Sequence, residues 1–158
     1  MNTFVAAVIA HWKAHGVDYL PGVTDDELRA FEKRYDVTLP KDMWCFYKAT
    51  NGTRAPLSAG QDHESYDFYQ LAEVKADEDF PWAMNFADYR ELSWWYAIDL
   101  SGQGGVGPGT VYFMGAIGKT PLVVAHGFGE FLDLYVRGDA RLWPDGAAAY
   151  HHALVSDI

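Results

Sequence analysis

The sequence predicts an α+β fold, in which helices come first, strands follow, and a helix comes after the last strand. Apolar residues in the N-terminal third recur at helical spacing. From Ser65 onward, short aromatic and β-branched runs are separated by glycine, proline and acidic turns, which is typical of strands. This order differs from the regular alternation of strand and helix in a doubly wound sheet, so we expect an α+β arrangement.

Two helices are expected before residue 36. The first covers residues 3–15, because apolar residues there share one helical face and Gly16 stands where a helix would end. A second begins after Thr24, since a capping box lets the Thr24 hydroxyl accept from the Glu27 amide. The apolar positions of the two helices are Phe4, Val5, Val8, Ile9, Trp12, Leu28, Phe31 and Tyr35.

Leu39-Pro40 predicts the start of a third helix, because proline fits the first helical turn. Asn51-Gly52 offers the left-handed residue that would end it. The buried face of this helix should hold Met43, Trp44, Phe46 and Tyr47.

Strands are expected near Tyr66–Ala72, Trp94–Leu100, Thr110–Ala116 and Leu122–His126, with Ser101–Gly109 as a glycine-rich hairpin loop. Apolar residues from Phe128 to Tyr135 predict a helix closed by Gly138. A short final helix is expected through Ala147–Val155. No repeat or linker divides the chain, so residues 1–158 are expected to form a single domain.

Charge is the most informative global property of the chain. Acidic residues outnumber basic ones by 22 to 12, which gives a net charge of -10. We expect no nucleic-acid ligand, because phosphate binding needs clustered Lys and Arg, and we expect a basic protein as the partner. The stretch from Gln61 to Asp79 is strongly acidic, with Lys75 as its one basic residue. It is either a solvated face or a binding surface.

The glycine run that begins at Gly102 satisfies the GxGxxG pattern of dinucleotide-binding loops. Such a loop must open a helix whose N-terminus faces the pyrophosphate. Here Pro108-Gly109 leads directly into the strand-like Thr110–Phe113. We therefore expect no nucleotide cofactor.

No catalytic or metal site is expected. Cys45 lies between Trp44 and Phe46, which favours a buried small hydrophobe over a nucleophile. Asp62-His63-Glu64 and His151-His152 lack the spaced pairs that zinc or iron requires. His11 and His15 have the right spacing for a shared helix face, but no third ligand is suggested. We expect no enzyme activity and no cofactor.

Three segments resemble the SUKH superfamily, the bacterial immunity proteins that share a domain with a yeast regulator of cell-wall synthesis. Residues 22–52 are similar to the family's opening, with a capped helix, Leu-Pro, an aromatic-rich helix and Asn-Gly. Residues 95–113 are similar to its central strand pair, and residues 124–132 to its closing strand and helix. The resemblance implies a mixed, mainly antiparallel sheet with helices packed around it.

The resemblance also implies a non-catalytic antidote that binds a cognate bacterial toxin and blocks its active site. Many such toxins are nucleases with basic grooves, which an acidic antidote could imitate. The alternative is a regulatory or scaffold protein of the same fold, outside toxin systems. With Cys45 alone there is no internal disulfide, and the apolar run near the N-terminus is too short for a membrane span, so we expect a cytoplasmic protein.

The acidic stretch and its aromatic neighbours are the expected partner-binding residues: carboxylates would speed encounter with a basic toxin, and rings would hold the complex. The aromatic content also leaves room for a homodimer. The predicted contact residues are Asp62, Glu64, Tyr66, Asp67, Tyr69, Asp77, Glu78, Asp79 and Trp82.

Overall fold

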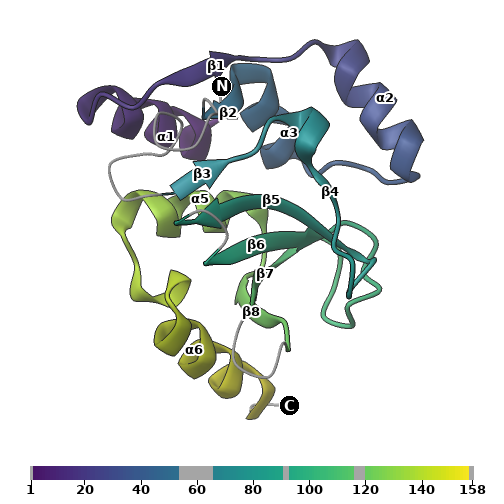
Figure 1. The fold of residues 1–158 in the computed structure, drawn as a ribbon, viewed down its shortest axis with the longest axis vertical. Helices are drawn as coiled ribbons and strands as arrows, with labels where there is room; N and C mark the ends of the chain where they lie inside the picture. Colours follow the sequence, from purple (N-terminus) through teal and green to yellow (C-terminus); the bar gives the residue numbers. More distant parts are fainter. Residues whose placement is uncertain (1, 54–65, 91–92, 116–119, 157–158) are drawn as a thin grey trace.

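Helices from both ends of the chain surround a central β-sheet, which confirms the predicted α+β class (Figure 1). The computed structural model describes residues 2–53, 66–90, 93–115 and 120–156. The N-terminal helices are α1 (Thr3–Ala14), α2 (Asp25–Tyr35) and α3 (Lys41–Ala49), and the C-terminal ones are α5 (Phe128–Arg137) and α6 (Pro144–Ser156).

The main sheet has the strand order β3-β5-β6-β7-β8, and every described pairing in it is antiparallel. The short β4 also pairs with β5, at a different part of that strand from β3. β1 and β2 form a separate two-stranded sheet. The strands are β1 (Tyr19–Pro21), β2 (Thr50–Thr53), β3 (Tyr66–Phe68), β4 (Lys75–Ala76), β5 (Ala83–Tyr89), β6 (Trp94–Asp99), β7 (Thr110–Met114) and β8 (Leu122–Ala125). Two 3₁₀ turns, η1 (Leu71–Glu73) and η3 (Ala140–Leu142), complete the described elements.

The predicted helix boundaries follow their capping residues. The Thr24 hydroxyl accepts from the Glu27 amide at 3.2 Å, and α5 ends at Gly138 with a φ of 63°. The prediction that Asn51-Gly52 ends the third helix is wrong: α3 ends at Ala49, and Thr50 is already extended. The cause is strand pairing, since Thr50 lies opposite Pro21 in the β1–β2 ladder.

Two strand predictions also need correction. Leu71 and Ala72 belong to η1 and not to a strand. β5 was not expected, although it pairs with β3, β4 and β6. A bulge between Asn85 and Ala87 breaks the alternation of side chains, so the segment lacks the period of two that marks a strand in sequence.

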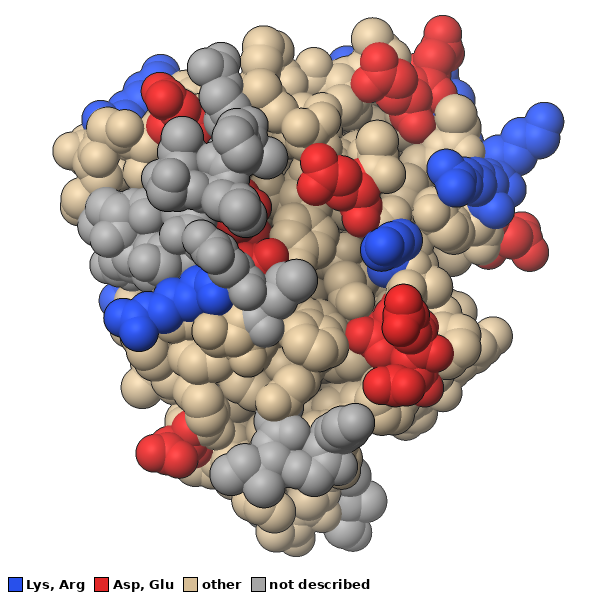
Figure 2. All heavy atoms as spheres, in the orientation of Figure 1, with Lys and Arg blue, Asp and Glu red and all other residues tan. Residues whose placement is uncertain are grey.

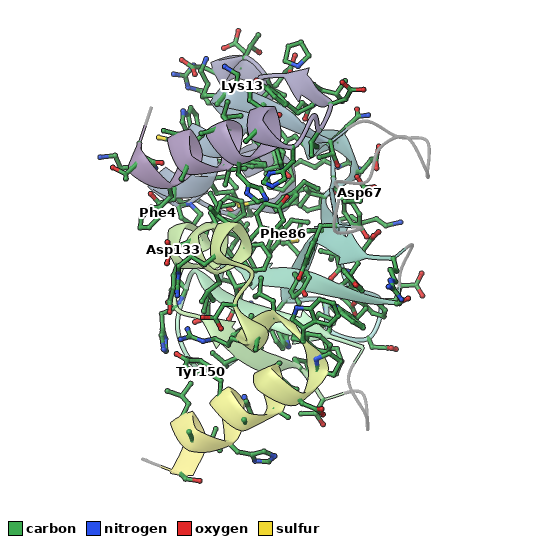
Figure 3. All side chains as sticks on the ribbon, turned by 90° about the vertical axis from the view of Figure 1, so that its left-hand side faces the viewer. Phe4, Lys13, Asp67, Phe86, Asp133 and Tyr150 are labelled. Carbon is green, nitrogen blue, oxygen red and sulfur yellow. The ribbon has the colours of Figure 1, made fainter. Side chains whose placement is uncertain are left out.

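One face of the sheet carries the main core. Phe86, Tyr96 and Phe113 on that face are at most 1% exposed and belong to the core that the helices cover. Trp12 of α1 donates through its indole nitrogen to the Tyr135 hydroxyl of α5 at 2.8 Å, which ties the two helices together. Figure 3 shows Phe86 in this interior and Asp67 away from it, on the other side of the sheet.

On the opposite face of the sheet, α6 covers only one end, the end formed by β7 and β8. Tyr150 and Leu154 of α6 pack on the part formed by Tyr112, Met114 and Val123. The backbone amide of Val123, in the edge strand β8, donates to His151 Nδ1 at 3.0 Å. The part of this face formed by β3, β5 and β6 carries the polar residues described next.

Candidate partner-binding surface

A row of side chains crosses four strands on the face away from the main core. The pairing register places Asp67 of β3 opposite Asp88 of β5, Asp88 opposite Trp95 of β6, and Trp95 opposite Met114 of β7. Directly opposed residues project from the same side of a sheet. The row therefore brings two carboxylates, an indole and a thioether together.

The two opposed carboxylates each receive a hydroxyl. The Tyr69 hydroxyl donates to Asp88 Oδ2 at 2.8 Å, and the Thr53 hydroxyl donates to Asp67 Oδ1. Burial and the neighbouring Asp88 carboxylate raise the pKa of Tyr69 far above its ordinary value, so this phenol remains a donor. Like charges directly opposite each other destabilise a sheet, and a hydroxyl that donates to each carboxylate offsets part of that cost.

Asp77 organises the segment between β4 and β5. Its Oδ1 accepts from the backbone amides of Asp79 and Phe80 at 2.9 and 3.1 Å, and its Oδ2 accepts from Asn85 Nδ2 and Trp95 Nε1 at 3.1 and 3.0 Å. Burial alone would raise the pKa of Asp77, but these four hydrogen bonds outweigh it and hold the pKa below its ordinary value. Asp77 is therefore a fixed negative charge and not a proton donor.

The turn that Asp77 holds presents two carboxylates to solvent. Glu78 and Asp79 are exposed at its tip, whereas Phe80 is half-buried. Two adjoining hollows of about 300 and 280 Å³ share Asp77, Asp79 and Trp95 as lining residues. Figure 2 shows carboxylate groups on this side of the molecule, over the region where Figure 1 draws β3, β4 and the segment that leads into β5.

We call this region the acidic face. It contains six carboxylates and one basic residue, together with the aromatic rings of Tyr69 and Trp95 and the side-chain amide of Asn85. Its members are Asp67, Tyr69, Glu73, Lys75, Asp77, Glu78, Asp79, Asn85, Asp88 and Trp95. Such a surface can bind a cationic group through charge while the rings contribute apolar contact area.

The structure places the predicted contact residues in several environments. Asp67, Tyr69, Glu78 and Asp79 lie together on the acidic face. Asp62 and Glu64 lie outside the described residues. Trp82 is half-buried and belongs to a neighbouring hollow, where its ring packs edge-on against Tyr112 at a centroid distance of 4.9 Å.

Two expectations about these residues are wrong. Tyr66 is 3% exposed and its ring packs against Tyr89, Tyr96 and Tyr135 in the main core, because residue 66 projects from the helix-covered side of β3. Asp77 was predicted to be a contact residue, but it is 7% exposed because its carboxylate accepts hydrogen bonds from the turn, Asn85 and Trp95. The sequence reasoning also missed Asn85 and Asp88, which lie on the unexpected strand β5, and Trp95, which it placed in a strand but not at the site.

The glycine-rich loop folds around a carboxylate of the protein itself. Asp99 is fully buried, its Oδ1 accepts from the Gly102 amide at 2.8 Å, and its Oδ2 accepts from the Gly104 amide at 2.8 Å. These amides are of the kind that hold a phosphate in a nucleotide-binding loop. The loop leads into β7 and not into a helix, as the sequence predicts.

Other candidate chemistry takes structural roles. Cys45 is half-buried and packs against the main core. His15 Nδ1 lies 2.8 Å from the His11 carbonyl oxygen. Within residues 2–53, 66–90, 93–115 and 120–156, no group of three His, Cys, Asp or Glu side chains is placed to hold a metal ion. In those same ranges, no helix has both the length and the apolar character needed to cross a bilayer.

Comparison with known proteins places the chain in a family. No curated protein matches the sequence. The model of the SMI1 / KNR4 family (SUKH-1) matches residues 22–134, which is more than half of the chain and includes α2, α3, the whole main sheet and most of α5. The match confirms the resemblance drawn from the capped helix, the central strand pair and the closing helix. The protein therefore belongs to the SMI1 / KNR4 family, within the SUKH superfamily.

Proposed function

We propose that the protein is a cytoplasmic, non-catalytic immunity protein, a single domain that binds a cognate bacterial toxin and blocks it. The observation that carries this proposal is the acidic face. Its exposed Glu73, Glu78 and Asp79 carboxylates would attract and pair with basic residues of a partner. Membership of the family supports a role in binding a protein.

The chemistry of the face favours binding over catalysis. The Asp77 carboxylate is saturated by four donors, and Tyr69 keeps its proton, so neither group is poised to transfer one. The exposed carboxylates at residues 73, 78 and 79 would attract a basic toxin such as a nuclease, whose substrate groove is positively charged. Half-buried rings such as Trp95 would then contribute to retention.

The test uses the toxin domain encoded beside the gene, with its catalytic residue inactivated. Glu73, Glu78 and Asp79 are changed to their amides, and the association rate constant is measured at several salt concentrations. At low salt we expect the rate constant to fall by about tenfold or more, and its salt dependence to flatten.

The matched control carries Asp18→Asn, Asp26→Asn and Asp145→Asn, which removes the same net charge at exposed positions away from the acidic face. We expect the control to associate at nearly the parental rate and to protect cells from the active toxin. Equal slowing of the two variants would assign the effect to net charge alone. A parent that neither binds nor protects would overturn the proposal in favour of a regulatory or scaffold role.

A further inference from the structure

A second hollow lies between α2 and η1, outside the acidic face. Its volume is about 300 Å³, and buried apolar residues line much of it, among them Val23, Phe31, Leu71 and Val74. We call it the α2–η1 groove. The groove is open because Ala30 on α2 and Ala72 on η1 are small and exposed, so neither side chain fills it.

The walls of the groove are fixed by contacts on both sides. The Leu71 amide donates to Asn51 Oδ1 at 2.8 Å, which ties η1 to β2. The Val23 amide donates to the Tyr47 carbonyl at 2.8 Å, and the rings of Phe31 and Tyr35 lie 4.8 Å apart. A preformed apolar groove needs little reorganisation when a side chain enters it.

The two ends of the groove carry opposite charges. Glu27, Ala30, Phe31 and Arg34 form one stripe of α2, with the carboxylate and the guanidinium at its ends. No described carboxylate pairs with Arg34, whose guanidinium lies over the Tyr35 ring at 5.3 Å from the centroid. Glu27 and Arg34 are seven positions apart on α2, which corresponds to about 10 Å along the helix axis. About three residues of extended chain cover the same length.

We propose that the α2–η1 groove binds a short extended segment of a partner protein, with an apolar side chain in the hollow and a carboxylate on Arg34. Guanidinium groups bind carboxylates in a planar, two-bonded geometry, so Arg34 supplies direction as well as charge. Glu27 repels a carboxylate at the other end of the stripe, which favours one orientation of the segment. The proposal rests on the proposed function only in assuming that the ligand is a protein.

The groove adjoins the acidic face through η1. Leu71, Ala72 and Val74 line the groove, whereas Glu73 and Lys75 line the acidic face. A partner that covers both would meet an apolar anchor point beside a charged surface. Apolar anchors in preformed pockets control dissociation, whereas surface charge mainly controls association.

The test needs no toxin. A displayed library of random peptides is selected on the wild-type protein, and we expect enriched sequences that pair an apolar residue with Asp or Glu one or two positions away. Ala72→Phe and Ala30→Phe fill the groove at exposed positions and should weaken binding of a selected peptide by about tenfold or more. Arg34→Glu should exchange the acidic preference for Lys or Arg.

The controls are Ala10→Phe, which adds the same ring on the exposed side of α1, and Arg29→Glu, which reverses a charge that pairs with Asp26 on α2. Both should bind the peptide as the parent does, and the amide variant of residues 73, 78 and 79 should do so as well. Failure of the toxin experiment would therefore leave this result unchanged.

Three results would overturn the proposal. The first is enrichment of no common sequence, and the second is equal binding by Ala72→Phe and the parent. The third is a wild-type dimer in sedimentation equilibrium that Ala72→Phe converts to a monomer, because the groove would then hold a second copy of the chain. Two-dimensional NMR locates the peptide, since the Leu71 and Val74 methyl signals should shift and those of Val155 should not.

Discussion

The indole nitrogen of Trp95 donates to the Asp77 carboxylate at 3.0 Å, although the two residues are 18 positions apart in the chain. This bond fastens the turn between β4 and β5 to the face of β6. Asp77→Asn keeps the shape of the side chain but turns an NH₂ group toward donors. We expect the free energy of unfolding of this variant, measured in urea, to be about 1–3 kcal/mol lower than that of the parent.

Glu78→Gln removes a charge from the neighbouring exposed residue and serves as the control. It should unfold at the parental urea concentration. If the Asp77→Asn and Glu78→Gln midpoints coincide, Asp77 does not hold the turn. The low pKa of Asp77 also gives the sign of its pH effect: its stabilisation is present above the ordinary aspartate pKa and decreases as pH falls through the native value.

Native tyrosines should ionise unevenly in alkali. Burial raises the pKa values of Tyr47, Tyr69 and Tyr96 far above the ordinary value, and it raises the pKa of Tyr112 to about 12. Near pH 11, about one unit above the ordinary value, the native protein should show less phenolate absorbance than the urea-unfolded chain. Stability should decrease as pH rises above about 10, because the unfolded state then loses protons that the native state keeps.

Tyr69→Phe isolates the contribution of one of these residues. The variant keeps the ring but removes the hydroxyl that donates to Asp88. Its difference in phenolate absorbance between native and unfolded protein should shrink by one tyrosine. An unchanged difference would show that Tyr69 ionises freely in the native protein.

Gly22 should not tolerate a side chain. A Cβ atom at this position would lie 1.9 Å from the Lys48 carbonyl oxygen, which is backbone and cannot rotate away. We expect Gly22→Ala to lose about 3 kcal/mol or more of stability in thermal or urea unfolding. Gly127→Ala is the matched control, because a Cβ there meets nothing within 4 Å, and it should lose about 1 kcal/mol or less. Similar losses of stability in the two variants would mean that the backbone at Gly22 can move away from the Lys48 carbonyl.

Protonation of His151 should weaken the contact between α6 and β8. Its Nδ1 must lack a proton to accept from the Val123 amide, and burial together with the nearby His152 lowers its pKa below 6.5. A lowered histidine pKa means that the unfolded state binds more protons, so stability should fall as pH drops below about 6.5. His151→Asn offers an acceptor that does not titrate, and its melting temperature should change less between pH 7.5 and pH 5. An identical change in parent and variant would exclude His151 as the cause.

Helix ends were predictable where a single residue determines them. Thr24 caps α2 through one hydroxyl, and Gly138 ends α5 because it adopts a positive φ at little cost. The end of α3 was not predictable in this way, because Thr50 pairs with Pro21 of β1, and its hydroxyl donates to the carbonyl of Leu20, 30 positions earlier. The residues around Thr50 do not indicate that β1 will pair with them.

The acidic face was predictable in its charge but not in its geometry. Glu78 and Asp79 could be assigned to an acidic surface from composition alone. Asp88 could not, since its position opposite Asp67 depends on the pairing of β3 with β5 and on the bulge at Phe86. Tyr66 and Asp67 differ by one position and face opposite sides of the sheet, because side chains alternate along a strand, so a continuous stretch of sequence cannot form one binding face.

The bond between Val123 and His151 has a consequence for behaviour at high concentration. An edge strand with free amides can serve as a template for a strand of another molecule, and this is how many β proteins polymerise. In β8 the Val123 amide is not available to another strand, because it donates to the His151 imidazole of α6, and the helix also packs against the strand. Loss of that helix would therefore turn β8 into a growth point for strand-by-strand association between molecules.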